Sequence, residues 1–242
     1  QSGDAELALG YFERGLKIRE ELRAANPQSA DAARNVSESL NQLSDFLSQH
    51  GQSGDAEQAL GHFERDLKIS EELLSANPQS ARAARDVSVS LNKLGDFLAK
   101  RGQSGDAEHA LGYFERSLEI KEGLLSANPQ SAQAARDVSV SHVAMYHFHL
   151  RHGNAEAANT HLSQCFAILD NFAQAEAKGF TEAALYYQRG ESQFALGRFK
   201  EAFDSFTRAL QRPQAAEAEE FTRLRLAEAA LTNRNFDAAI AN

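Results

Sequence analysis

Between residues 55 and 102, apolar residues recur every three or four positions, in two runs that a short polar break separates. The first run consists of Ala56, Ala59, Leu60, Phe63, Leu67 and Leu74. The second run consists of Ala84, Val87, Leu91, Leu94 and Leu98. This spacing places the apolar side chains on one face of an α-helix, whereas a half-buried strand alternates apolar and polar residues. The pattern predicts two amphipathic helices in this region.

Residues at the ends of the two runs predict where the helices begin and end. Asn77 precedes Pro78, and the residue before a proline is disfavoured in the helical region, so the first helix should end there. The side chains of Asp55 and Ser80 are each expected to cap the start of a helix. Gly102 supplies a turn after the second helix. The first helix is therefore predicted from about Asp55 to Ala76, and the second from Ser80 to just before Gly102.

The same two-helix pattern occurs three times, with a period of 51 residues. The segment QSGDAE begins at Gln1, Gln52 and Gln103, and the segment ANPQSA begins at Ala25, Ala76 and Ala127. A two-helix unit buries its apolar stripes only against neighbouring units, so the repeats predict an all-α fold, an α-solenoid of stacked antiparallel helical hairpins. The predicted regions are three near-identical repeats over 1–153, a diverged junction helix over 154–180, and shorter repeats over 181–242.

The shorter repeats contain an ordered set of aromatic and small residues. Its members are Tyr186, Tyr187, Gly190, Gly197, Phe199, Ala202, Phe206, Ala209, Leu210 and Pro213. This set resembles the tetratricopeptide repeat family, and the 51-residue units resemble an elongated variant of that repeat. The resemblance implies a right-handed superhelix. A last repeat beginning near Ala227 is expected to be cut off inside its second helix, and the natural protein is expected to continue beyond both ends.

In the family that the chain resembles, the first helix of each pair (helix A) lines a concave groove that holds a peptide. Carried over to the first repeat, the groove residues are Glu38, Asn41, Gln42, Asp45 and Gln49. In the second repeat they are Val89, Asn92, Lys93, Asp96 and Lys100. In the third repeat they are Val140, Val143, His147 and Arg151. Drift on a solvated face is the alternative explanation of their variation. Asp45 and Asp96 replace the neutral amides that clamp a terminal carboxylate, so a free carboxylate tail is not the expected ligand.

Comparison of the three copies also predicts which faces meet water, because exposed positions tolerate change better than packed ones. In helix A the changes fall at Asp31, Asn35, Glu38, Gln42 and Gln49, and at their counterparts Arg82, Asp86, Val89, Lys93 and Lys100. In the other helix (helix B) they fall at Leu7, Tyr11, Gly15, Arg19 and Arg23, and at their counterparts Gln58, His62, Asp66, Ser70 and Leu74. The third copy has His109, Tyr113, Ser117, Lys121 and Leu125 at these helix B positions. Both stripes are predicted to be solvent faces.

The third helix A departs from the repeat pattern. Two leucines of the core stripe become His142 and His149, and Tyr146 replaces a glycine. Together with His147, His152 and His161 they form a histidine-rich segment. Three interpretations stay open: a metal site on the 142–152 helix, a pH-responsive contact, and a seam where long repeats meet ordinary ones. No carboxylate-histidine motif accompanies the histidines, so no metal ligand is assigned.

Composition narrows the function classes. The 242 residues carry 34 acidic and 25 basic side chains, for a net charge of −9, with one cysteine. This acidic balance argues against nucleic-acid binding, and no segment is apolar enough for a membrane span. The predicted helical array and its resemblance to the tetratricopeptide repeat family imply a non-enzymatic scaffold without cofactors that binds a protein or peptide partner, and the composition favours a cytoplasmic location. Arrays of this family in bacterial multidomain proteins often sit beside an effector domain. Uncovered terminal faces also allow end-to-end self-association, a structural alternative to the groove.

Overall fold

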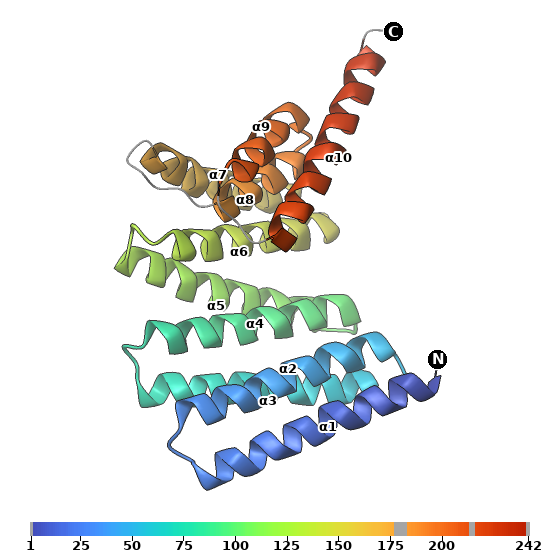
Figure 1. Cartoon of the computed structure of the whole chain (residues 1–242), viewed down its shortest axis with the longest axis vertical. Helices are drawn as coiled ribbons and strands as arrows, with labels where there is room; N and C mark the ends of the chain where they lie inside the picture. Colours follow the sequence, from blue (N-terminus) through green and yellow to red (C-terminus); the bar gives the residue numbers. More distant parts are fainter. Residues whose placement is uncertain (1, 177–182, 213–215, 241–242) are drawn as a thin grey trace. The chain divides into compact units, whose positions relative to one another are not determined.

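The computed structural model describes residues 2–176, 183–212 and 216–240, and the described residues form helices and turns without a strand (Figure 1). The first five helices are α1 (Ser2–Ala25), α2 (Ala30–His50), α3 (Asp55–Ala76), α4 (Ala81–Arg101) and α5 (Asp106–Ala127). The other five are α6 (Ala132–Arg151), α7 (Ala155–Glu176), α8 (Ala183–Ala195), α9 (Phe199–Leu210) and α10 (Ala216–Ile240). The chain forms two compact units, Gln1–Leu124 and Leu125–Asn242, with the division inside α5.

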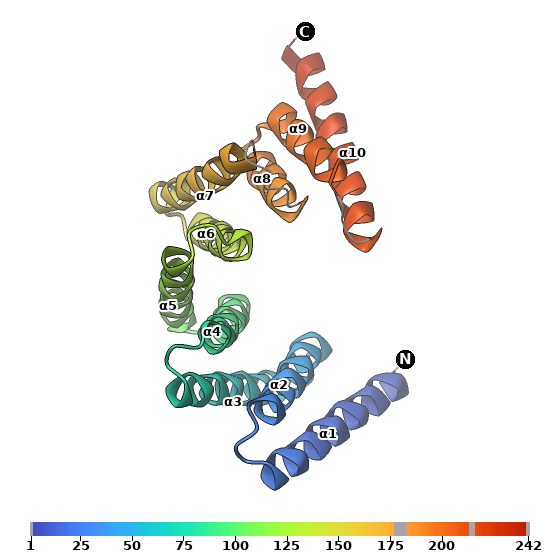
Figure 2. The ribbon, with the colours of Figure 1, turned by 60° about the vertical axis from the view of Figure 1, so that its left-hand side comes forward.

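In the first unit, successive helices run in opposite directions and are joined by short turns (Figures 1 and 2). The α3 bounds match the prediction. Ser80 caps α4 as predicted, because its hydroxyl accepts a hydrogen bond from the Ala83 amide at 3.1 Å. Gly102 ends α4 at a φ of 65°, a left-handed conformation that glycine adopts without strain. The predicted all-α stack of antiparallel helix pairs is confirmed.

The predicted cap at the start of α3 is wrong. Helix α3 begins at Asp55 itself, after Gly54, and no side chain caps it. The Asp55 carboxylate instead accepts a hydrogen bond from the Gln52 amide at 2.8 Å and lies 2.8 Å from His50 Nδ1. A carboxylate in the first helical turn still interacts favourably with the helix dipole, and here it also ties the start of α3 to the end of α2.

The core of the first unit lies along the apolar stripes that the sequence predicts. Leu40, Leu47, Leu91 and Leu94 are fully buried. Burial of one such side chain stabilises the fold by roughly 1.5–3 kcal/mol. Helices α4 and α5 approach closely at Gly95, where an added Cβ would lie 2.9 Å from the Phe114 ring. The position therefore excludes a larger side chain while Phe114 keeps its place.

The prediction of a solvent face on helix B is wrong over half of its length. Leu7 and Tyr11 are exposed, but Asp66, Ser70 and Ser117 are buried. The burial of Asp66 and Ser70 follows from the packing of α3 against both α2 and α4, and Ser117 of α5 donates a hydrogen bond to the Ser88 carbonyl of α4. Ser70 bonds Ser90 of α4 at 3.0 Å, so variation at this position changes a polar contact between helices.

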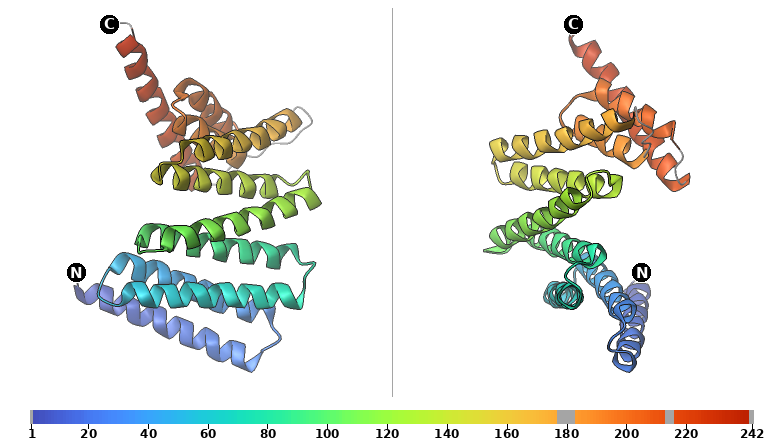
Figure 3. Two further views of the ribbon diagram at one scale, coloured as in Figure 1. Left: turned by 180° about the vertical axis from the view of Figure 1, so that it is seen from behind. Right: turned by 90° about the vertical axis from the view of Figure 1, so that its left-hand side faces the viewer.

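The second unit begins with the antiparallel pair α6 and α7 and continues with α8, α9 and α10 (Figure 3). Tyr146 of α6 packs against Ala158 and Leu162 of α7. Helices α8 and α9 approach at Gly190, where an added Cβ would lie 2.5 Å from the Phe206 ring. Helix α10 is continuous over Ala216–Ile240, so the expected break between two helices of a last repeat does not occur there.

Candidate functional site

The first unit contains a cavity of about 560 Å³ between the C-terminal halves of α2 and α4 and the N-terminal half of α3. Five of the predicted groove residues line it, namely Asp45, Gln49, Lys93, Asp96 and Lys100. The remaining lining residues are Leu47, Ser48, Gly51, Gln52, Ala56, Phe63, Phe97 and Arg101. The structure thus brings the C-terminal ends of two successive A helices together around one space.

Two aromatic rings contribute to the apolar lining of this cavity, together with Leu47 and Ala56. Phe63 of α3 and Phe97 of α4 are both buried, and their ring centroids are 5.4 Å apart. The Arg101 guanidinium lies over the Phe97 ring, 5.7 Å from its centroid, in a cation–π arrangement. An apolar side chain entering the cavity would meet aromatic carbon here. Sequence reasoning assigned Phe63 to the core and missed its second role.

The charged groups around the cavity are mostly paired. Lys93 Nζ lies 2.7 Å from the Asp45 carboxylate and joins α4 to α2. Arg101 donates two hydrogen bonds to Asp106, at 2.8 and 2.6 Å. These hydrogen bonds lower the pKa of Asp106 below its usual range. Lys100 is exposed and forms no ion pair with any residue that the structure describes, so its ammonium group is available to a ligand.

The other predicted groove residues of the first two repeats lie outside the cavity. Glu38 and Gln42 are exposed on α2, where the Gln42 amide donates to the Glu38 carboxylate at 3.5 Å. Asn41 is half-buried and donates to the Ser37 carbonyl at 3.1 Å, so its amide turns back along its own helix. Val89 is exposed and Asn92 half-buried on α4.

The predicted groove residues of the third repeat belong to the second unit. Val143 is half-buried and packs against the cluster formed by Ala132, Ala135, Cys165 and Leu169. Val140, His147 and Arg151 are exposed on α6. Three of the four side chains of this set therefore remain accessible to a partner.

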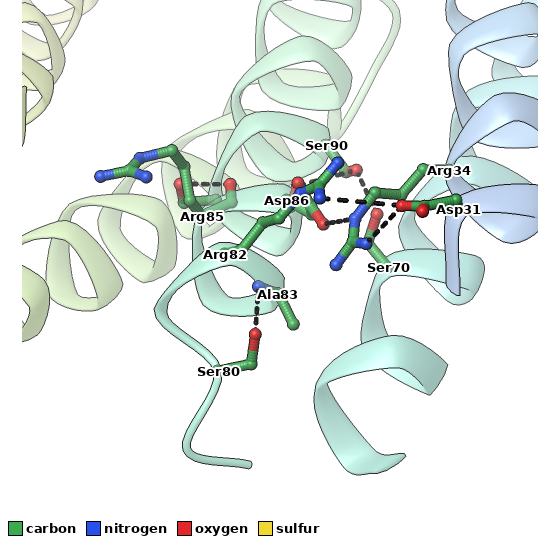
Figure 4. A network of polar contacts seen from close by, with 10 residues as sticks. Asp31, Arg34, Ser70, Ser80, Arg82, Ala83, Arg85, Asp86 and Ser90 are labelled. Atoms are coloured by element: carbon green, nitrogen blue, oxygen red, sulfur yellow. Dashed lines mark hydrogen bonds and ion pairs between the residues drawn. The ribbon is translucent and has the colours of Figure 1, made fainter. Parts of the chain in front are cut away.

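A polar network joins the N-terminal parts of α2 and α4 (Figure 4). Arg34 Nε donates to the Asp86 carboxylate at 2.7 Å, and Asp31 lies near both Arg34 and Arg82, at 3.3 and 3.7 Å. The Lys93–Asp45 pair, which lines the cavity, is a second ion pair between the same two helices. The sequence contains an indication of these ion pairs, because the oppositely charged residues are about one repeat apart.

The structure brings three of the predicted histidines together in the second unit. His142 Nδ1 lies 3.1 Å from His161 Nδ1, and the His149 ring stacks on the His161 ring with centroids 5.4 Å apart. His152 instead stacks on Phe148, and His147 is exposed. The histidine pair therefore links α6 to α7.

Burial disfavours the charged forms of His142 and His161. Burial lowers the pKa of His142 to about 4, with a smaller effect from a positive charge on His161. Burial is also the main cause that lowers the pKa of His161, and a positive charge on His149 lowers it further. Within residues 2–176, 183–212 and 216–240, no group of three or more His, Cys, Asp or Glu side chains is arranged to hold a metal ion. A neutral hydrogen-bonded contact between helices describes these residues best.

Comparisons with known proteins agree with this architecture. Residues 183–215 match the family model described as Tetratricopeptide repeat. TTC0263, a thermophilic TPR protein of Thermus thermophilus, has a similar structure, with a TM-score of 0.55, 19% identity and 95% coverage of both chains. BtubC from P. vanneervenii is also similar, with a TM-score of 0.60 and 16% identity over 98% of this chain and 87% of that chain. A comparison of the sequence with curated proteins finds no match.

The similar structures support the fold, and the residues that match the family model include α8 and α9. The family match does not reach the 51-residue repeats, whose description as an elongated variant stays a prediction. No helix among the described residues combines the length and apolar character needed to cross a bilayer.

Proposed function

We propose that the chain is a protein-interaction scaffold that holds an extended segment of a partner protein in the cavity between α2 and α4. Tetratricopeptide repeat proteins generally serve as protein–protein interaction scaffolds. The observation that carries the proposal for this chain is the cavity itself, because residues of two successive A helices converge on it. Its volume of about 560 Å³ suits one or two side chains of a bound segment.

The chemistry of the cavity favours a segment that carries an apolar side chain next to an acidic one. Phe63 and Phe97 offer aromatic carbon to the apolar side chain. Lys100 offers an ammonium group, whereas Lys93 and Arg101 already pair with carboxylates. An acidic side chain beside Lys100 therefore gains a charge interaction without displacing an existing one.

The experiment is a selection of binding peptides from a random library displayed to the chain, followed by affinity measurements on the selected peptides. We expect the selected sequences to place Asp or Glu close to an aromatic or aliphatic residue. The variant Lys100→Glu should weaken their binding by about tenfold or more, which corresponds to about 1.4 kcal/mol.

Lys68→Glu is the matched control, because Lys68 is an exposed lysine of α3 that does not line the cavity. This variant carries the same charge change and should bind as the unmodified chain does. Equal affinity of the selected peptides for the Lys100→Glu variant and the unmodified chain would place the binding site elsewhere.

A further inference from the structure

A group of polar side chains surrounds the buried carboxyl group of Asp66, in the first unit. Asp66 of α3 is 1% exposed. Three uncharged side chains lie close enough to its carboxyl group to affect its pKa, those of Ser90, Ser37 and Asn41. Ser70 of α3 belongs to the same group, because its hydroxyl lies 3.0 Å from the Ser90 hydroxyl (Figure 4). Helices α2, α3 and α4 therefore all contribute oxygen atoms to one buried place, which we call the oxygen cluster.

The hydrogen bonds of these side chains leave several acceptor oxygens of the oxygen cluster unsatisfied. The Asn41 amide donates to the Ser37 carbonyl at 3.1 Å, within α2. The Ser90 hydroxyl donates to the Asp86 carbonyl at 3.2 Å, within α4. Ser37 Oγ, Asn41 Oδ1 and both carboxylate oxygens of Asp66 are buried, and none of them forms a hydrogen bond of normal distance and angle with another described residue. Buried polar atoms in this condition call for a further ligand.

The third copy of the repeat shows what an uncharged side chain does at the same position. Ser117 replaces Asp66 there and donates to the Ser88 carbonyl at 2.8 Å, and Ser88 is the counterpart of Ser37. An ionised carboxylate has no hydrogen to donate in this way. The second copy therefore needs a positively charged ligand at Asp66, whereas the third copy satisfies the position with a hydroxyl.

We infer that the Asp66 carboxylate, together with the oxygens of Ser37 and Asn41, binds an alkali-metal cation, Na⁺ or K⁺. Carboxylate, amide and hydroxyl oxygens are ligands that suit hard cations, whereas many transition metals favour imidazole or thiolate. One carboxylate balances one positive charge, and a divalent ion would leave an uncompensated charge in the interior. Cation binding at the oxygen cluster needs no partner segment in the cavity between α2 and α4.

The charged residue that acts on Asp66 is already held by another carboxylate. Lys93 of α4 lowers the pKa of Asp66 slightly, but its ammonium group lies 2.7 Å from the Asp45 carboxylate. Because Asp45 holds Lys93, the ammonium group does not pair with Asp66, and its charge is largely balanced. Ser37 and Asn41 are half-buried, so the oxygen cluster lies close enough to solvent for a small ion to exchange.

The test is urea unfolding of the 242-residue chain at mildly alkaline pH, with NaCl or KCl exchanged for choline chloride at constant total concentration. Constant ionic strength removes general screening from the comparison. A cation that binds only the folded chain, at ten times its dissociation constant, raises the ratio of folded to unfolded chain about elevenfold. The urea midpoint of the unmodified chain should therefore rise when NaCl or KCl replaces choline chloride, and the salt that acts at lower concentration identifies the preferred cation.

Three variants connect this response to the oxygen cluster. Asp66→Ser introduces the residue of the third copy and should unfold at the same urea midpoint in all three salts. Ser37→Ala removes one neutral oxygen and keeps the charge, so its midpoint should respond only at severalfold higher cation concentration. Glu64→Gln, at an exposed acidic residue of α3, is the matched control and should respond as the unmodified chain does.

Equal urea midpoints of the unmodified chain in the sodium, potassium and choline salts would overturn the inference, because a proton would then be the positive ligand of Asp66. An Asp66→Ser variant that responds as strongly as the unmodified chain would overturn it too. A full response of Ser37→Ala would place the bound cation away from the oxygen cluster, and this result also contradicts the inference.

Discussion

Two helix pairs with similar sequence patterns each place one large aromatic ring in their contact, but the ring comes from the first helix in one pair and from the second helix in the other. Between α4 and α5 of the first unit, Gly95 leaves room for the Phe114 ring. Between α6 and α7 of the second unit, Tyr146 takes the glycine position and packs against Leu162. Leu162 follows the buried Ala158 by four residues, as Phe114 follows Ala110. The large ring has moved from one helix to the other.

A substitution in one helix is therefore matched by a substitution in the helix that it contacts. His142, which replaces a core leucine, meets His161 of α7. Helices α8 and α9 return to the first solution, with Gly190 against Phe206. The third helix A departs from the repeat pattern because its partner helix has changed too, which supports the interpretation of this region as a seam between two kinds of repeat.

The greatest loss of stability is expected when the Tyr146 ring of the second unit is removed. Tyr146→Gly leaves a cavity between α6 and α7 and should lower the free energy of unfolding by about 4 kcal/mol. Adding Leu162→Phe should restore part of that loss, because it recreates the glycine–phenylalanine pair. Unfolding in urea measures both variants. A double variant no more stable than the single one would show that the two positions do not exchange volume.

The second largest loss of stability is expected from the reverse exchange in the first unit, in which a large ring replaces the glycine of α4. Gly95→Tyr forces a ring against Phe114 and should cost roughly 1–3 kcal/mol of stability. Phe114→Leu in the same chain should relieve the clash. The measurement is a double-mutant cycle of unfolding free energies, and strictly additive effects would contradict direct contact between the two positions.

The pair of His142 and His161 predicts that the stability of the second unit depends on pH. Burial holds the pKa of His142 at about 4, below its value of 6.5 outside the fold, so the neutral form stabilises the native state. This contribution is complete above pH 6.5 and is lost as the pH falls toward 4. The variant His142→Leu restores the residue of the other copies and should lose less stability on acidification. Thermal melting across this pH range checks it, and parallel curves would contradict the prediction.

Asp66 of the first unit is expected to cause a smaller pH dependence of stability, with the opposite sign. Asp66 is 1% exposed, and burial raises the pKa of its carboxyl group, an effect that the nearby side chains of Ser90, Ser37 and Asn41 offset only in part. The protonated form therefore favours folding, and its contribution is lost as the pH rises through the raised pKa. The third copy has Ser117 at this position, which donates to the Ser88 carbonyl at 2.8 Å.

The variant Asp66→Ser should accordingly be more stable than the unmodified chain at neutral pH, with a difference that shrinks in acid. Urea unfolding at two pH values measures that difference. A destabilised variant at neutral pH would mean that the Asp66 carboxylate is stabilising as an anion.

The sequence predicts the helix ends well because the residues that set them act locally. Pro78, Ser80 and Gly102 each restrict the backbone or satisfy it within a few residues. The burial of Asp66 and Ser70 was not predictable in this way, because α3 is covered by helices on two sides and variable residues there form contacts across to α2 and α4. Repeat comparison alone identifies variation, and it does not separate exposed positions from polar positions inside an interface.

The candidate site was predicted in part for the same reason. Asp45, Gln49, Lys93, Asp96 and Lys100 follow from their helix A positions, and the structure places them around one cavity. Phe97 and Arg101 were missed because one belongs to a buried face and the other to the end of a helix. Their contribution depends on the contact of Arg101 with the Phe97 ring and with Asp106, which no local pattern specifies.

The most direct test of the proposed role of the cavity is site-specific photo-crosslinking of a selected peptide. A photoreactive residue at Gln49, which lines the cavity, should crosslink to the peptide, and excess unlabelled peptide should suppress the product. The same residue at Lys68, outside the cavity, should give little product. Strong crosslinking at Lys68 with none at Gln49 would contradict the account.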